Sequence, residues 1–193
     1  IATHAFGSPT DDERERPEYW RYWKTLPPKG DIAIYIGAWY SRPLIDNAYE
    51  RTGLATYDRE LSRIVAFERE LVDDGVLILK FWMHLGKKAQ KKRLDALEKD
   101  SLTRWRITDR EKENWAMYDR FEVASDRLIH KTNTAETSWH IVEGEDSNYR
   151  TIAVARTALN EMRQMLSVKS VKATAVPSFF SSDQEPAINV LRQ

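Results

Sequence analysis

The sequence predicts an α/β fold in which helices alternate with the strands of a doubly wound parallel sheet. Three short apolar runs carry this prediction, at residues 32–35, 76–83 and 139–142. Unbroken apolar runs of this length are typical of parallel strands buried on both faces, whereas half-exposed strands alternate polar and apolar residues. Stretches with helical periodicity separate the runs, and they supply the crossover connections that parallel strands need.

The elements are expected in alternating order along the chain. Residues 1–6 are expected to form an extended strand, the second of a sheet whose first strand precedes the chain, which lacks an initiator methionine. Apolar residues recur at helical spacing from Tyr57 to Val72, and Gly75 suits the turn that ends this helix. Further helical patterns cover about residues 17–25, 87–99, 109–130 and 149–166.

The last part of the sequence differs from the rest in composition. From Ser167 onward there is no clear periodicity, and two prolines, Pro177 and Pro186, interrupt the segment. We therefore expect a domain over residues 1–166 and a linker or tail over residues 167–193 that leads toward a second domain.

Composition narrows the class of protein. With 193 residues, of which 41% are hydrophobic and 11% aromatic, the chain has enough apolar side chains for one sizeable core. No apolar run approaches the roughly 20 residues that cross a bilayer, and the start of the chain lacks the pattern of a signal peptide, so we expect a cytoplasmic protein without a membrane partner. The absence of cysteine excludes disulfides, thiolate metal sites and cysteine nucleophiles.

Charge is balanced overall but unevenly distributed. The chain has 30 basic and 30 acidic residues, which gives no reason to expect nucleic-acid binding. Between residues 85 and 110, however, the sequence contains nine lysines and arginines but only four acidic residues. Taken by itself, this basic segment with its net charge of +5 is explained by an ordinary solvated helix face.

Several tryptophan-rich motifs follow one another in order over about residues 1–166. They are Thr3-His4-Ala5-Phe6-Gly7-Ser8-Pro9-Thr10, Tyr19-Trp20-Arg21-Tyr22-Trp23, Leu26-Pro27-Pro28-Lys29-Gly30, Trp39-Tyr40-Ser41-Arg42, Phe67-Glu68 with Asp74-Gly75, Lys80-Phe81-Trp82-Met83-His84-Leu85, Gln90 with Arg93-Leu94, Trp105-Arg106, Thr132 with Trp139, and Val142-Glu143-Gly144. Motifs this long and in this order are far more specific than a single glycine pattern. On these residues the chain resembles the polyphosphate kinase 2 family.

The resemblance implies a P-loop nucleotide-kinase-like core with a helical lid, which would cover about residues 85–110. It also implies phosphoryl transfer between polyphosphate and a nucleotide, most simply AMP to ADP, with Mg²⁺ as cofactor. Polyphosphate and an adenine nucleotide are then the expected partners, together with a homo-oligomer or a second copy of the domain. The family's phosphate loop is absent from this sequence and would precede Ile1.

One motif departs from the family in a way that bears on activity. Active members usually read Asp-Arg-Ser-Trp-Tyr-Asn-Arg where this chain has Ile36 and Gly37, followed by Ala38-Trp39-Tyr40-Ser41-Arg42. A carboxylate that holds magnesium and a guanidinium beside the transferred phosphoryl group are therefore missing. This departure makes the chain resemble the amino-terminal half of two-domain polyphosphate:AMP phosphotransferases, and it predicts a degenerate copy. The rival prediction is a non-catalytic structural, dimerisation or polyphosphate-docking domain.

Candidate ligand-binding residues are basic, since no intact catalytic set remains. Arg42 follows the first buried strand, at the sheet edge where ligands of α/β folds bind, and a structural ion pair is an equal alternative. Arg21 is a candidate near the nucleotide, and packing between its helix and the sheet is the simpler explanation. Phosphate-binding candidates, by resemblance to the lid, are Arg93, Arg104, Arg106, Lys87 and Lys88.

Histidines and acidic residues predict no intrinsic metal site. His84 ends an apolar strand and is expected to be a hydrogen-bonded core residue rather than a base. Asp73 and Asp74 are better explained as a helix end and a turn than as an acid pair. The remaining histidines show no metal-ligand spacing.

Overall fold

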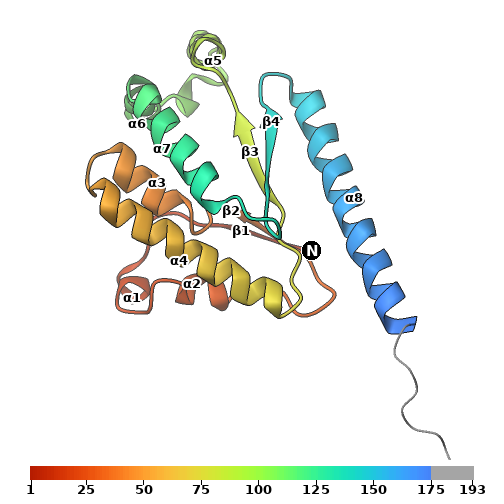
Figure 1. Ribbon diagram of the computed structural model, residues 1–193. Helices are drawn as coiled ribbons and strands as arrows, with labels where there is room; N and C mark the ends of the chain where they lie inside the picture. Colours follow the sequence, from red (N-terminus) through yellow and green to blue (C-terminus); the bar gives the residue numbers. More distant parts are fainter. Residues whose placement is uncertain (175–193) are drawn as a thin grey trace, which may run out of the picture. The chain divides into compact units, whose positions relative to one another are not determined.

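The computed structural model describes residues 1–174 and shows an α/β arrangement of parallel strands and helices (Figure 1). Residues 1–154 form one compact unit, and a second unit starts at residue 155 within the last helix. The elements are β1 (Ala2–Ala5), α1 (Asp11–Arg14), α2 (Trp20–Trp23), β2 (Ala33–Ile36), α3 (Ser41–Ala48), α4 (Leu54–Asp73), β3 (Lys80–His84), α5 (Lys87–Lys99), the 3₁₀-helix η1 (Arg104–Arg106), α6 (Asp109–Ala116), α7 (Tyr118–Thr132), β4 (Trp139–Glu143) and α8 (Ser147–Thr174).

The strands form two parallel pairs. β1 pairs with β2 in the register Ala2 opposite Ala33, so the prediction that the first residues form a strand is confirmed. β3 pairs with β4 in the register Lys80 opposite Trp139. Parallel strands separated by helices were expected, but within residues 1–174 they form two two-stranded sheets and not one continuous sheet.

Strand pairing decides where the second apolar run, residues 76–83, becomes a strand. The sequence predicts a strand over residues 76–83, whereas β3 begins at Lys80, because its partner β4 begins at Trp139 and offers no ladder further upstream. Ile78 still packs against the hydrophobic core as part of the connection. His84, expected in the core, lies exposed at the end of β3.

Two helix predictions change in detail, and one helix was not predicted. The helix expected over residues 109–130 is divided at Met117 into α6 and α7. The helix α3 was not predicted from the sequence, and Pro43 lies in its first turn, where a missing N–H costs nothing. The helix α8 continues to Thr174, so the start of the expected tail is helical, while residues 175–193 lie outside the described residues.

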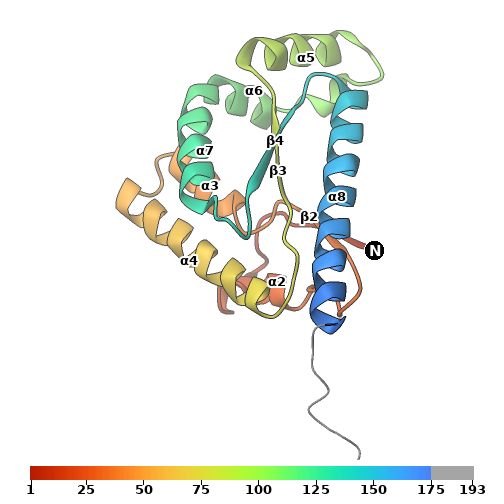
Figure 2. The ribbon, with the colours of Figure 1, turned by 45° about the vertical axis from the view of Figure 1, so that its right-hand side comes forward.

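The hydrophobic core of the first unit is built around α4. Its apolar stripe, which includes the fully buried Tyr57, Leu61 and Ile64, packs against α3 and α7 (Figure 1, Figure 2). The Tyr57 hydroxyl donates to the carbonyl of Ala124 at 2.9 Å, which satisfies a polar group inside this core. The helix predicted from the periodicity of residues 57–72 is therefore confirmed as the central element of the fold.

The helices of the described chain were also tested for membrane-spanning character. Within residues 1–174 no helix combines the length and the apolar composition that would let it span a bilayer.

Candidate functional site

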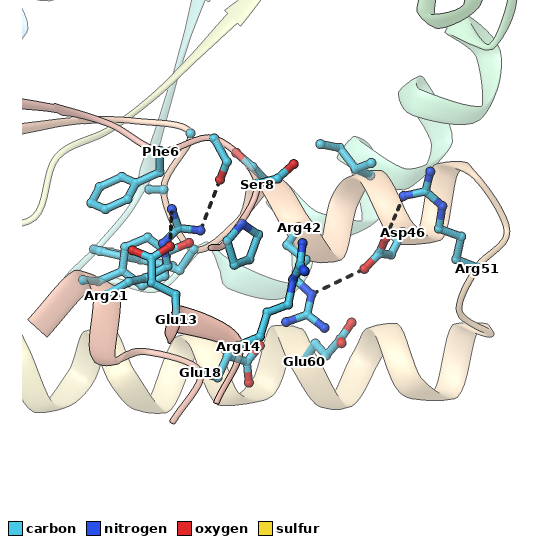
Figure 3. A pocket seen from close by; sticks show the side chains of 18 of the residues that line it. Phe6, Ser8, Glu13, Arg14, Glu18, Arg21, Arg42, Asp46, Arg51 and Glu60 are labelled. Carbon is cyan, nitrogen blue, oxygen red and sulfur yellow. Dashed lines mark hydrogen bonds and ion pairs between the residues drawn. The ribbon is translucent and has the colours of Figure 1, made fainter. Parts of the chain in front are cut away.

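A cleft of about 1300 Å³ lies beyond the carboxyl ends of β1 and β2 (Figure 3). The segment that follows β1, from Phe6 to Pro9, forms one part of its wall, and the turn and helix that follow β2 form another. Residues between positions 13 and 22, in α1, α2 and the segment that joins them, and residues of α4, α6 and α7 also contribute to the lining. Because ligands of open α/β folds bind at the carboxyl ends of the strands, this cleft is the candidate binding site.

The cleft lining is rich in charge and has an excess of two positive groups. Seven arginines alternate with five carboxylates around it. Arginine offers a planar fork of N–H donors that matches a phosphate group, so this lining suits an anionic ligand. The arginines are Arg14, Arg16, Arg21, Arg42, Arg51, Arg63 and Arg110, and the carboxylates are Glu13, Glu18, Asp46, Glu60 and Glu113.

Arg42 lines the cleft from the first turn of α3, and its ion pair is weak. The Nε of Arg42 lies 3.6 Å from Asp46 one turn further along the helix, and Asp46 also pairs with Arg51 at 3.2 Å. The Arg42 side chain remains 64% exposed (Figure 3). Both sequence interpretations of Arg42 therefore coexist: it has a helical ion pair, and its guanidinium borders the cleft.

Arg21 lines the same cleft but is held much more firmly. Its Nη1 donates to the Gly7 carbonyl at 3.1 Å, its Nη2 lies 3.4 Å from Glu13, and its guanidinium stacks on the Phe6 ring at 5.1 Å. The side chain is only 12% exposed, and within the described residues its Nε has no hydrogen-bond partner. Arg21 therefore packs between α2 and the end of β1 while bordering the cleft.

The turn after β2 lacks the groups that the family places there. Gly37 has φ +68°, and a Cβ at this position would lie 2.6 Å from the Phe6 carbonyl oxygen. The backbone conformation and the close approach both require glycine. Ile36 beside it is 60% exposed and offers no oxygen ligand.

The predicted lid residues lie elsewhere on the surface. Lys87, Lys88 and Arg93 are exposed on α5, and Arg104 and Arg106 are exposed on η1. None of these five belongs to the described lining of the cleft, so the structure does not bring them together with Arg42 and Arg21. Lys87 instead binds Asp119 of α7 at 2.7 Å. Of the basic segment, Arg110 at the start of α6 reaches the cleft.

Several cleft residues were missed from the sequence because they lie beside an apolar stripe. Glu60 and Arg63 are one turn apart on α4, next to the core positions of that helix. Burial, together with the nearby Glu18 carboxylate, raises the pKa of Glu60 above its usual range. A charged pair spaced three residues apart along a core helix is the signal that could have identified this face.

A fully buried polar network lies behind the cleft. Glu68 and Lys80 are 1% and 4% exposed, and the Lys80 ammonium donates to the Glu68 carboxylate at 3.0 Å. The same ammonium donates to the Thr132 carbonyl at 2.6 Å and to the Thr137 hydroxyl at 3.2 Å. Burial lowers the pKa of Lys80, and the facing Glu68 carboxylate offsets part of this effect.

The second oxygen of Glu68 reaches the turn after β2. It accepts hydrogen bonds from the Trp39 indole at 3.1 Å and from the Tyr40 hydroxyl. Burial and the Glu68 charge together raise the pKa of Tyr40 well above its usual range. Residues from four separate sequence motifs, at positions 39–40, 68, 80 and 132, thus meet in one network, which explains why they occur together.

The donor set of the described chain does not fit a magnesium ion. Within residues 1–174 no group of three or more histidine, aspartate or glutamate side chains could hold a metal ion. The turn at Ile36 and Gly37 supplies no carboxylate, and the cleft carboxylates Glu13, Glu18 and Asp46 are bound to arginines. No chemical step of this chain is therefore assigned to a metal.

Comparisons with known proteins agree with the motifs. The family described as Polyphosphate kinase 2 matches residues 1–170. The Polyphosphate:AMP phosphotransferase of Pseudomonas aeruginosa is 38% identical over 169 residues, which is 88% of this chain and 34% of that protein. The protein of the same description from Pseudomonas syringae pv. tomato is 36% identical over 176 residues, which is 91% of this chain and 35% of that protein. The chain thus spans about a third of the length of these relatives.

A solved structure shares the fold. The crystal structure of Polyphosphate Kinase 2 from Arthrobacter aurescens superposes with a TM-score of 0.75 at 26% identity, covering 96% of this chain and 62% of the other. The α/β architecture with parallel strands is thereby confirmed, and so is the resemblance seen in the motifs.

Proposed function

Because the chain belongs to the polyphosphate kinase 2 family, we propose that it is a domain of a polyphosphate:AMP phosphotransferase that binds AMP without transferring the phosphoryl group itself. The observation that carries this proposal is the contrast within one site. The cleft keeps seven arginines at the ligand-binding edge, while the turn beside it has glycine and isoleucine in place of the acid.

The shape and lining of the cleft support a nucleoside monophosphate. Arg42 and Arg51 share one carboxylate, Asp46, so a phosphate can replace that carboxylate as their common partner. Between the end of α3 and α7 the lining includes two aromatic rings, Tyr49 and Phe121, at 6.0 Å between ring centroids. A flat base can pack there while the phosphate meets the arginines.

The backbone at Gly37 supports the loss of turnover in this copy. A simple substitution would restore the missing acid at Ile36, but no side chain fits at Gly37 without moving the Phe6 carbonyl. The site therefore differs from an active one in its backbone as well as in its side chains. Phosphoryl transfer would then take place in a second copy of the domain.

The proposal also includes a separate binding surface for polyphosphate. The basic residues of α5 and η1 are exposed and lie outside the cleft. Closely spaced lysines and arginines can bind a chain of phosphates, because they neutralise its repeated negative charges.

The test measures binding and turnover separately on the 193-residue chain. We expect isothermal titration to detect AMP, adenosine to bind much more weakly, and no ADP to form from AMP with polyphosphate and magnesium. ADP formation by this chain would refute the non-catalytic assignment. Failure to bind AMP would refute the assignment of the cleft.

One observation favours the rival role in association between domains. Ile34 and Ile36 of β2 and Ile141 of β4 are 49%, 60% and 56% exposed, which is unusual for β-branched residues in parallel strands. A purely structural domain would use this apolar surface and would not bind AMP. The titration above distinguishes the two roles.

A further inference from the structure

We propose that the buried Glu68–Lys80 pair is a positioning device that fixes the turn after β2 and thereby sets where Arg42 meets a ligand in the cleft. The ligand part of this inference rests on the proposed function, because it takes AMP as the probe. The positioning part rests on the geometry alone and has a readout of its own.

The contacts run from the centre of the fold to the cleft wall in two steps. The Oε2 of Glu68 accepts from Lys80 of β3 at 3.0 Å and from the Thr137 hydroxyl, just before β4, also at 3.0 Å. The Oε1 accepts from the Trp39 indole and the Tyr40 hydroxyl. One carboxylate therefore joins the β3–β4 pair to the turn that follows β2.

That turn leads directly into the helix that carries Arg42. Tyr40 is the cap residue that precedes α3, and the Ser41 amide donates to the Ala38 carbonyl at 3.0 Å. Because Trp39 and Tyr40 directly precede α3, hydrogen bonds that hold their side chains also fix the position and the direction of the first turn of α3. Arg42 is the second residue of α3, so its Cα is placed by these hydrogen bonds.

A buried charge pair is a costly way to obtain stability, which is why a positioning role is the better explanation. Apolar residues of similar volume commonly stabilise a fold as well as a buried ion pair does, or better. Apolar residues, however, offer no acceptor to the Trp39 indole N–H and the Tyr40 hydroxyl, which need one at a defined place. Glu68 supplies that acceptor, and Lys80 keeps its charge compensated.

The decisive variant is the double substitution Glu68→Leu with Lys80→Met, which removes both charges together. We expect the double variant to fold with a free energy of unfolding below that of the unmodified chain, because the Trp39 indole and the Tyr40 hydroxyl lose their acceptor. In hydrogen exchange, the amides of Ser41 and Leu44, which donate to the Ala38 and Tyr40 carbonyls at the start of α3, should exchange faster. AMP affinity should fall about tenfold, because small displacements of a binding group are costly.

A matched ion pair on the same helix provides the control. Asp58 of α4 binds Arg127 of α7 through two contacts of 2.7 and 2.6 Å, and both residues lie outside the cleft lining. Asp58→Asn with Arg127→Gln should leave exchange at Ser41 and Leu44 unchanged, and AMP affinity as well. This control separates loss of an α4 ion pair in general from loss of the pair that reaches the turn.

The possible outcomes are all informative. A folded double variant with normal exchange at Ser41 and Leu44 would overturn the inference. Faster exchange in a chain that never binds AMP would support positioning and refute the proposed function alone. If the double variant does not fold, Tyr40→Phe decides instead: it removes one hydrogen bond to Glu68 and keeps the ion pair, so unchanged exchange in that variant would equally overturn the inference.

Discussion

The buried network and the arginine-rich cleft contain the same kinds of charged groups in opposite environments. In the network, Glu68 and Lys80 are almost inaccessible to solvent. They bind each other, and each makes further hydrogen bonds to neighbouring residues. In the cleft, Arg42 and Arg51 share Asp46 and stay largely exposed. The difference teaches that burial, and not residue type, decides whether a charge holds the fold together or remains available to a ligand.

The largest expected effect comes from breaking the network on one side. Lys80→Met leaves the Glu68 carboxylate buried without its cation, which should lower the free energy of unfolding by about 3 to 5 kcal/mol. Urea denaturation followed by tryptophan fluorescence measures this loss. Adding Glu68→Leu should recover only part of it, because the buried charge is removed while the Trp39 and Tyr40 donors lose their acceptor. A loss below about 1 kcal/mol for Lys80→Met alone would contradict a buried charge pair.

The next effect is a loss of stability at alkaline pH. Burial raises the pKa of Tyr57 and of Tyr40 above the ordinary value of 10.0. Their stabilising contribution is therefore complete below pH 10 and is lost as the pH rises further, by about 1.4 kcal/mol per pH unit for each tyrosine. Denaturation curves between pH 9 and 11.5 should show this slope, and Tyr40→Phe should reduce it. A flat profile would contradict the burial of these hydroxyls.

Gly37 offers a test of the backbone at the cleft edge. Gly37→Ala places a Cβ against the Phe6 carbonyl at a positive φ, so we expect a loss of about 1 to 3 kcal/mol in the free energy of unfolding. Gly53→Ala is the matched control, because a Cβ there meets open space.

The clash of a side chain at Gly37 with the Phe6 carbonyl also bears on activity. Ile36→Asp with Gly37→Arg should not restore phosphoryl transfer, and recovered turnover would show that only side chains were missing.

Arg42 should behave in the opposite way to Lys80. Arg42→Ala is expected to change the free energy of unfolding by less than about 0.5 kcal/mol, because the side chain is exposed and its ion pair is long. AMP affinity should fall about tenfold, which corresponds to about 1.4 kcal/mol. Arg59→Ala on the exposed face of α4 is the control. An unchanged AMP affinity would place the phosphate elsewhere in the cleft.

The smallest effect concerns the basic segment outside the cleft. Arg104→Ala with Arg106→Ala should weaken polyphosphate binding and reduce its dependence on salt, since fewer counterions are released. The slope of log affinity against log salt concentration should fall by about two. Stability should not change, because both side chains are exposed on η1. An unchanged slope would move the polyphosphate site away from this segment.

Phosphate binding by Arg42 stays a prediction. The location of Arg42 just after the end of β2 could be predicted, because the turn there is short. Glu60 and Arg63 could not, since they reach the cleft only through the packing of α4 against α3. The five basic residues of α5 and η1 were grouped with Arg42 by resemblance, and the structure keeps them apart from it.

The sequence by itself determined the family, the alternation of helices and parallel strands, and the absence of an acid at Ile36 and Gly37, because these depend on motif order, local periodicity and residue identity. Only the tertiary structure decided that β3 begins at Lys80, that Gly37 closes against Phe6, and that Glu68 joins the turn after β2 to Lys80. These features depend on contacts between residues far apart in the chain, and whether a charge there is buried is settled by packing and not by its neighbours in sequence.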